Sequence, residues 1–235
     1  KLISVIVPAY NEEDCVNELA RRLGAVFDSN PAYDFEAIII ENGSEDRTWE
    51  LLREISVADA RFKLVQLARN FRMDGGITAG LEYATGDAAV IMTADLQDPP
   101  ELITEFITKW EEGYENVYMV VTKRTDAGWI RSFNSRAFYW LAGKLTDNRI
   151  PSNASDFRLV DRKVYETVRQ LDERNRFVRG LFAWVGFRST GIEHERPERF
   201  GGTSKAHSFK VIDLAFKGIF AHSYVPLRLI PLIGV

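Results

Sequence analysis

Short runs of apolar, mostly β-branched residues alternate along the first half of the chain with longer segments that are apolar at helical spacing. The short runs predict buried strands at residues 2–8, 35–41, 62–67, 88–93 and 117–122. The longer segments predict helices at residues 13–27, 46–58, 75–84 and 100–112, with Ser44 and Asp98 as caps or turn residues. This alternation predicts an α/β fold, a mostly parallel sheet flanked by helices, with ligands bound where the strands end.

The alternation breaks down from about Gly128 onward. A helix is predicted over residues 131–145, followed by a polar loop over 148–156 and another helix over 162–170. We find no internal repeat, low-complexity tract or linker, so we expect one catalytic domain over residues 1–204.

The C-terminal residues 205–235 differ in character from the rest. Over 205–220, large apolar residues are interleaved with lysines, which is typical of an amphipathic helix. The apolar run from Tyr224 is interrupted by Arg228 and Pro231 and is shorter than the roughly 20 residues that a spanning helix needs. Core packing and docking at a membrane interface both fit this pattern. We favour an amphipathic interfacial segment that leads to transmembrane helices missing from this sequence.

Composition narrows the function classes. The formal net charge of -4 argues against a nucleic-acid-binding protein, although local basic patches remain compatible with it. The single cysteine, Cys15, cannot form an internal disulfide and is interpreted as a structural thiol. Because no charged-then-apolar signal segment opens the sequence, we expect the domain to face the cytoplasm. A homo-oligomer is compatible with the sequence, which does not identify the oligomeric state.

Polar and aromatic side chains follow the first two predicted strands. Tyr10 could pack against a nucleotide base and Glu12 could accept a hydrogen bond from base or ribose, although an ordinary strand-to-helix turn could contain the same residues. After the second strand, Gly43 lets the backbone approach a ligand and Ser44 can cap the next helix. No glycine-rich dinucleotide or Walker-type loop is present, so phosphates must be bound by a metal or by basic side chains.

The fourth predicted strand runs into an acidic loop. Asp95, Gln97 and Asp98 offer oxygen ligands there, and Mg²⁺ or Mn²⁺ needs only one or two carboxylates in addition to waters and substrate phosphates. Asp98 could instead be a helix cap before Pro99 and Pro100, an alternative that does not explain Asp95. A further acid, Asp156, is expected in the polar loop of the second half.

The motifs VIVPAYNEE, ENGSEDRT, LARNF, TADLQDPPELI, NASDFRL, RFVRGL and RFGGTSK occur in this order along nearly the whole chain. In this combination the sequence resembles the polyprenyl-phosphate branch of the family 2 glycosyltransferases. That branch includes polyisoprenyl-phosphate (bactoprenol) glucosyltransferases and, more distantly, dolichol-phosphate mannose synthases. The resemblance implies a GT-A fold, a nucleotide-sugar donor, a divalent metal and inversion at the anomeric carbon.

The resemblance also implies roles for individual positions. It implies nucleotide-sugar binding by Pro8, Tyr10, Asn11, Glu12, Asn42 and Lys205. It implies metal binding by Asp95 and Gln97, catalysis by Asp95 and Asp156, and acceptor-phosphate binding by Arg124, Arg131, Ser135 and Arg199. Two positions depart from the family, which usually has acids where this chain has Asn42 and Thr93, and we expect the metal affinity to be reduced.

The expected activity is therefore a metal-dependent, inverting transfer of a sugar to a polyprenyl phosphate at a membrane, with UDP-glucose as the donor by resemblance. The family pattern makes Asp156 a general base. An acceptor phosphate is already largely ionised near neutral pH, because its second pKa is about 6, so orientation of the acceptor is the alternative role. Two other functions stay open: a catalytically impaired nucleotide-sugar-binding module, and a soluble nucleotidyltransferase or a transferase acting on a sugar hydroxyl. The amphipathic C-terminal segment argues against the soluble enzyme.

Overall fold

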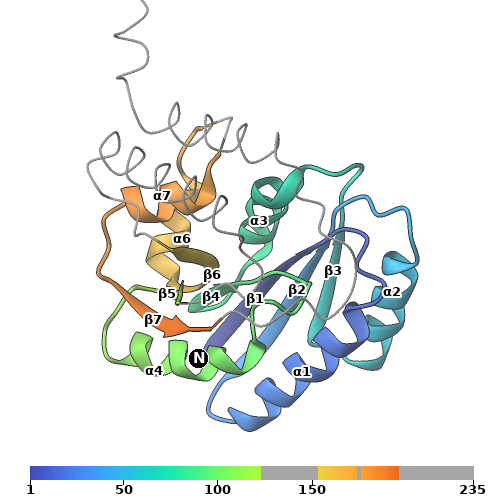
Figure 1. Cartoon of the computed structure of the whole chain (residues 1–235), viewed down its shortest axis with the longest axis horizontal. Coiled ribbons are helices and arrows are strands. Elements are labelled where there is room, and N and C mark those ends of the chain that lie inside the picture. Colours follow the sequence, from blue (N-terminus) through green and yellow to red (C-terminus); the bar gives the residue numbers. More distant parts are fainter. Residues whose placement is uncertain (123–152, 174–175, 196–235) are drawn as a thin grey trace, which may run out of the picture.

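The computed structural model describes residues 1–122, 153–173 and 176–195, which form a seven-stranded sheet covered by helices (Figure 1). The strands are β1 (Leu2–Ala9), β2 (Asp34–Glu41), β3 (Phe62–Gln66), β4 (Ala88–Ile91), β5 (Asn116–Val121), β6 (Ala154–Asp161) and β7 (Ser189–His194). The helices are α1 (Val16–Ser29), α2 (Thr48–Ala58), α3 (Arg72–Tyr83), η1 (Pro100–Leu102), α4 (Ile103–Glu111), α6 (Arg162–Arg169) and α7 (Val178–Trp184). The expected α/β fold is confirmed.

The sheet has the strand order β3-β2-β1-β4-β6-β5-β7. Strand β6 pairs antiparallel with both of its neighbours, β4 and β5, whereas every other described pair is parallel. The expectation of a mostly parallel sheet is therefore confirmed. Because β6 runs against the other strands, it begins at the edge where they end, which is the edge that binds ligands in open α/β sheets.

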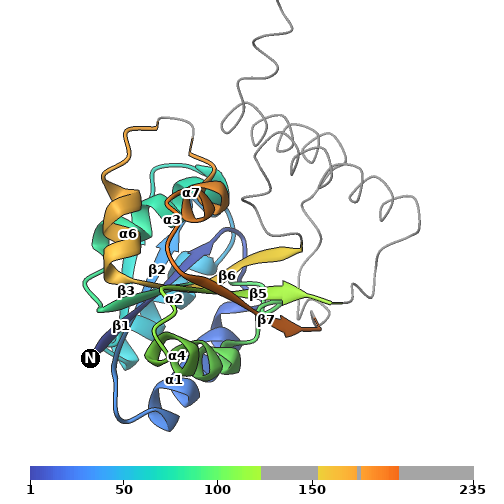
Figure 2. The same ribbon diagram turned by 90° about the vertical axis from the view of Figure 1, so that its left-hand side faces the viewer.

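Helices cover both faces of the sheet (Figures 1 and 2). Side chains alternate between the faces along each strand, and two separate cores result. Val5 and Val7 of β1 belong to the core that also contains buried residues of α1, α2 and α4. Ile6 of β1 and Ile91 of β4 belong to the core shared with α3, α6 and α7. The strands therefore read as continuous apolar runs because each of them is buried on both sides.

Two glycines bring α3 into close contact with β1. A Cβ atom added at Gly80 would lie 2.2 Å from Cγ2 of Ile6, and one added at Gly76 would lie 2.8 Å from Cβ of Pro8. Since real side chains do not approach this closely, the helix can lie where it does only with glycine at both positions. The glycines that fail to match a phosphate-binding motif thus have a packing role, and they fix the distance between α3 and the sheet.

The second half of the chain departs from the sequence prediction. The predicted loop over residues 148–156 is wrong from Ala154 onward, because these residues begin strand β6. The polar residues of this segment suggested a loop. Other residues of the same chain form hydrogen bonds with the side chains of Ser155 and Asp156, as described below. Helix α7 and strand β7 were not predicted, whereas the helix expected over 162–170 is present as α6.

The predicted helix over 131–145 and the C-terminal segment 205–235 lie outside the described residues. The boundary expected near residue 204 falls there as well, and it stays a prediction. Within the described part of the chain, no helix combines the length and the apolar character needed to cross a membrane.

Candidate active site

The predicted site residues gather at one edge of the sheet and on one of its faces. Ile6 is paired with Ile91, so continuing that parallel register by two residues sets Pro8 level with Thr93. Ile91 is paired in turn with Arg158 of the antiparallel strand, and the same continuation sets Thr93 level with Asp156. The alternation of side chains places Pro8, Thr93 and Asp156 on the face that carries α3, α6 and α7.

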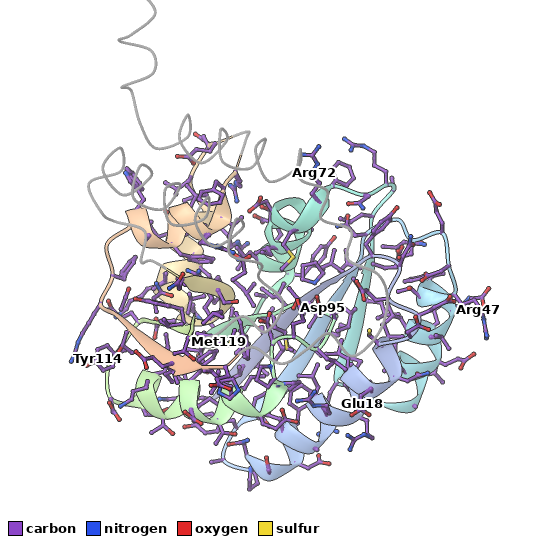
Figure 3. All side chains as sticks on the ribbon, in the orientation of Figure 1. Glu18, Arg47, Arg72, Asp95, Tyr114 and Met119 are labelled. Carbon is purple, nitrogen blue, oxygen red and sulfur yellow. The ribbon has the colours of Figure 1, made fainter. Side chains whose placement is uncertain are left out.

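A cavity of about 260 Å³ opens at this edge. Five predicted residues line it: Pro8, Tyr10, Glu12, Asn42 and Asp95. The other described lining residues are Ala9, Asn70, Thr93 and Ala94, together with Arg72 and Met73 at the start of α3. Figure 3 labels Asp95 near the centre of the view and Arg72 at the beginning of α3. The structure thus brings four of the six predicted donor residues and the principal predicted metal ligand, Asp95, into one cavity, whereas Asn11 is not part of the lining.

The loop after β4 is held together by the hydroxyl of Thr93. Its Oγ1 lies 2.7 Å from Oδ1 of Asp95 and 2.8 Å from Oδ2 of Asp98. A threonine hydroxyl has one hydrogen, so it can donate to only one of the two carboxylates at a time. Backbone N–H groups supplement it, because that of Gln97 donates to Asp95 at 3.3 Å and that of Thr93 donates to Asp98 at 3.2 Å.

Asp98 is not the helix cap that its position before two prolines suggested. The N-cap of η1 is Pro99, and no side-chain cap bond is made there. The carboxylate of Asp98 is fully buried, and besides Thr93 it lies 3.4 Å from the hydroxyl of Ser155 in β6. Asp98 therefore belongs to a chain of polar contacts that connects the Asp95 loop to the strand carrying Asp156.

The donor set at this edge fits a sparsely ligated divalent cation. Asp95 is 7% exposed and lines the cavity, and the half-buried Gln97 lies in the same loop. Among the described residues, no group of three or more histidines, cysteines, aspartates or glutamates could hold a metal ion. Such a site does not suit a structural zinc ion, which takes four protein ligands. It does suit Mg²⁺ or Mn²⁺, whose remaining ligands are substrate phosphates and water.

Asn42 lines the cavity and also forms hydrogen bonds that hold the local fold. Its Nδ2 donates to the carbonyl oxygen of Arg72 at 3.0 Å, and its Oδ1 accepts from the N–H of Phe71 at 2.9 Å. An aspartate, usual at this position by resemblance, could accept from Phe71 but would have no hydrogen for Arg72. The departure at Asn42 therefore has a physical reason, since the amide holds the segment that precedes α3. Next to it, Gly43 has a φ of 72°, and an added Cβ would lie 2.7 Å from backbone atoms of Arg69.

The turn after β1 is bound to the turn after β2. Oδ1 of Asn11 accepts from the N–H of Glu45 at 2.8 Å, and the N–H of Asn11 donates to Oγ of Ser44 at 3.0 Å. Of the two roles expected for Ser44, the turn role is therefore confirmed, whereas the cap role is wrong because Arg47 is the N-cap of α2. Asn11 adopts a φ of 52°, which asparagine tolerates better than most residues. Its role here is to shape the turn that presents Tyr10 and Glu12.

Asp156 forms an ion pair with Arg179 that was not predicted from the sequence. Nε and Nη2 of Arg179, in α7, donate to its two carboxylate oxygens at 2.8 and 2.5 Å. Two residues further along β6, Arg158 is 3% exposed and donates to the carbonyl oxygens of Asp156 and Ser155. Burial lowers the pKa of the Arg158 guanidinium to about 10, so the group still carries its charge at neutral pH. Arg179 lies in the quoted motif RFVRGL, which was the one signal available in the sequence.

Some predicted site residues lie outside the described part of the chain. These are the acceptor-phosphate candidates Arg124, Arg131, Ser135 and Arg199, together with the donor candidate Lys205. Their roles stay predictions, as do the ligand roles of the residues that line the cavity.

Comparisons with known proteins point in one direction. Residues 4–169 match the family described as Glycosyl transferase family 2. A Bacillus subtilis (strain 168) protein named uncharacterized glycosyltransferase YkcC is 45% identical over 232 residues, which are 99% of this chain and 72% of that protein. The bactoprenol glucosyl transferase of Shigella phage SfV is 36% identical over 236 residues, covering 99% of this chain and 76% of the relative.

A solved structure with the same fold is glucosyl-3-phosphoglycerate synthase from Mycobacterium tuberculosis in complex with Mn²⁺, UDP-glucose and phosphoglyceric acid. It has a TM-score of 0.61 at 17% sequence identity, over 94% of this chain and 78% of the synthase chain. This likeness confirms the GT-A fold.

Proposed function

Because the chain belongs to glycosyl transferase family 2, we propose that it transfers glucose from UDP-glucose to a polyprenyl phosphate, with inversion at the anomeric carbon. The phage relative named bactoprenol glucosyl transferase supports the lipid acceptor, and the UDP-glucose complex of the mycobacterial synthase supports the donor. One observation carries the proposal. Antiparallel β6 starts where β4 ends, so the Asp95 loop and Asp156 meet at the same edge of the sheet.

The donor is assigned to the cavity between β1, β2, β4 and α3. Tyr10 offers an aromatic face for the base, and Glu12 offers a carboxylate for base or ribose hydrogens. Asn42 and the glycine contacts of α3 set the width of the cavity. Asp95 and Gln97 would hold a divalent cation, which on binding would neutralise charge on the diphosphate of the leaving nucleotide.

The acceptor is assigned to the β6 side of Thr93. Both carboxylate oxygens of Asp156 accept hydrogen bonds from the guanidinium of Arg179. A phosphate monoester needs no base to become nucleophilic near neutral pH, because its second pKa is about 6. We therefore assign Asp156 to the orientation of the acceptor and not to the removal of a proton.

The lipid acceptor requires the reaction to take place at a membrane surface. Part of the proposal is that this surface is the cytoplasmic face and that residues 205–235 dock to it, because lysines flank large apolar residues in that segment. The segment lies outside the described residues. Vesicle flotation of the chain with and without residues 205–235 tests the docking of this segment separately.

The experiment that tests the proposed function is transfer of labelled sugar to lipid. The chain is incubated with Mg²⁺ or Mn²⁺, undecaprenyl phosphate in detergent, and a panel of labelled nucleotide sugars, and the label that enters the lipid phase is measured. We expect transfer with UDP-glucose and at least tenfold less transfer with GDP-mannose. Equal transfer from both donors would refute the choice of donor, and transfer to the free prenyl alcohol would refute the choice of acceptor.

Thr93 motivates a second candidate, a nucleotide-sugar-binding module without turnover. A threonine supplies no carboxylate to a cation, so the metal affinity could fall too low for catalysis. Calorimetric titration of UDP-glucose with Mn²⁺ and lipid phosphate present separates the two functions. Binding of UDP-glucose without formation of labelled product would favour the binding module.

A further inference from the structure

The motif RFVRGL forms the start of a firmly positioned helix. α7 begins at Val178, whose backbone N–H donates to Oδ1 of Asp74 in α3 at 3.0 Å. Val178, Leu181 and Phe182 are buried in the core shared by α3, α6 and α7. This packing fixes the backbone of the first turn and thereby aims the side chain of Arg179 at the edge of the sheet.

Arg179, Asp156 and Arg158 form a cluster with unequal charges. Arg179 holds Asp156 with a two-pronged contact, and both side chains are about one quarter exposed, at 24% and 27%. Arg158 is buried and donates to backbone carbonyls, including that of Asp156, and its guanidinium lies 5.2 Å from the centre of the Phe182 ring. The three side chains carry two positive charges and one negative charge. Arg158 thus adds a buried positive charge beside the ion pair, and a charge that is shielded from water attracts an anion more strongly than the same charge at the surface.

The cluster adjoins the donor cavity without being part of it. The lining of that cavity comes from the ends of β1 and β2, from the loop after β4 and from the beginning of α3, and it includes neither Asp156 nor Arg179. Thr93 lies between the two regions, level with Pro8 on one side and with Asp156 on the other. An anion bound by the cluster would therefore lie beside the donor and not in its place.

We infer that Arg179, oriented by Asp156 and supported by the buried charge of Arg158, binds the phosphate monoester group of the acceptor. This deepens the proposed function and rests on it. A guanidinium pairs with phosphate oxygens in a planar, charge-assisted geometry. Asp156 then acts as the fixed partner that keeps the Arg179 plane in place, and Arg158 acts through its charge without touching the ligand.

The test compares variants that keep or remove the guanidinium. Arg179→Gln removes the charge, and Arg179→Lys keeps the charge but loses the two-pronged geometry. Arg169→Gln is the matched control, because Arg169 in neighbouring α6 also pairs with a carboxylate, that of Glu82, away from the sheet edge. Each variant of the chain is titrated with a short, water-soluble prenyl phosphate, with the corresponding prenyl alcohol and with inorganic phosphate. Transfer kinetics are measured in parallel.

We expect Arg179→Gln to weaken binding of the prenyl phosphate and to raise its KM by roughly ten- to a hundredfold, with the KM of the nucleotide sugar changed less than threefold. Arg179→Lys should recover part of this loss, and Arg169→Gln should match the wild type. Weakened binding of both prenyl phosphate and inorganic phosphate locates recognition in the phosphate group. Weakened binding of the prenyl alcohol would place Arg179 at the lipid chain and contradict the inference.

A purely structural ion pair predicts a different pattern. In that case Arg179→Gln would lower the melting temperature and kcat but leave the phosphate affinity unchanged, which overturns the inference. Binding is measured without turnover, so the outcome is independent of the proposed activity. A wild-type chain that binds prenyl phosphate through Arg179 but makes no product would refute the proposed function alone.

Discussion

Replacing Thr93 by aspartate tests the proposed cation site, in which Asp95 is the one carboxylate ligand. The new carboxylate would replace a hydroxyl that lies within 2.8 Å of oxygens of both Asp95 and Asp98. Two unit charges about 4 Å apart interact by about 4 kcal/mol at an effective dielectric constant of about 20. Rotation of the new side chain and entry of water relieve part of this repulsion, so we expect a net loss of about 2–4 kcal/mol in the free energy of unfolding without metal.

A divalent cation should reverse this loss, because it gains a second carboxylate ligand. We expect Thr93→Asp to bind Mn²⁺ at least tenfold more tightly than the wild type, and its melting temperature to rise more on addition of metal. Electron paramagnetic resonance of free Mn²⁺ measures the affinity, and thermal melting with and without Mn²⁺ measures the linked stability. Thr93→Val is the control, since it removes the hydroxyl without adding charge and should cost about 1–3 kcal/mol in either condition. Equal Mn²⁺ affinity in the aspartate variant and the wild type would refute a cation site at this loop.

Three further predictions concern Asn42 in the cavity wall and the buried positions Gly80 and Cys15. Asn42→Asp should lower the free energy of unfolding by about 1–3 kcal/mol, because the carbonyl oxygen of Arg72 loses its donor and faces a carboxylate; denaturant titration against Asn42→Ser measures it, and an unchanged midpoint would contradict the assigned contact. Gly80→Ala should cost about 1–3 kcal/mol and weaken donor binding, because its Cβ would meet Cγ2 of Ile6 at 2.2 Å; melting and calorimetry with UDP-glucose check this, and a variant of wild-type stability would argue against the close packing of α3. Burial, assisted by Glu12, raises the pKa of the Cys15 thiol to about 11, so its rate of alkylation should increase through pH 10 without levelling off, whereas a plateau near pH 9 would contradict the burial.

The parallel part of the sheet was predictable because local signals and the fold agree there. The five predicted strands end within two residues of their positions in the structure, since buried parallel strands read as continuous apolar runs. The meeting of Tyr10, Asn42 and Asp95 followed from the same rule, because the ends of parallel strands share one edge.

The remainder depends on contacts between residues far apart in the sequence. Asp156 was expected in a loop because residues 148–156 are mostly polar. The partners supplied by Asp98 and by α7 make Ser155, Asp156 and Arg158 compatible with a buried strand. Periodicity does not show the antiparallel direction of β6, and spacing does not show that Arg179 reaches Asp156. From the sequence, Asn42 was expected to weaken metal binding because it replaces an acid. In the structure, both the nitrogen and the oxygen of its amide have a hydrogen-bonding partner.

The central claim is that the Asp95 loop and Asp156 serve one transfer reaction at a shared sheet edge. Its most direct test is the initial rate of transfer of labelled glucose to polyprenyl phosphate by Asp95→Asn, Asp156→Asn and the control Asp87→Asn, whose carboxylate binds Leu2 and Arg162 at the opposite edge. We predict that both site variants lose at least about a hundredfold in rate, while the Asp87 variant stays within about threefold of the wild type, as expected for a group that only contributes to folding. A rate for either site variant equal to that of the control would contradict the account.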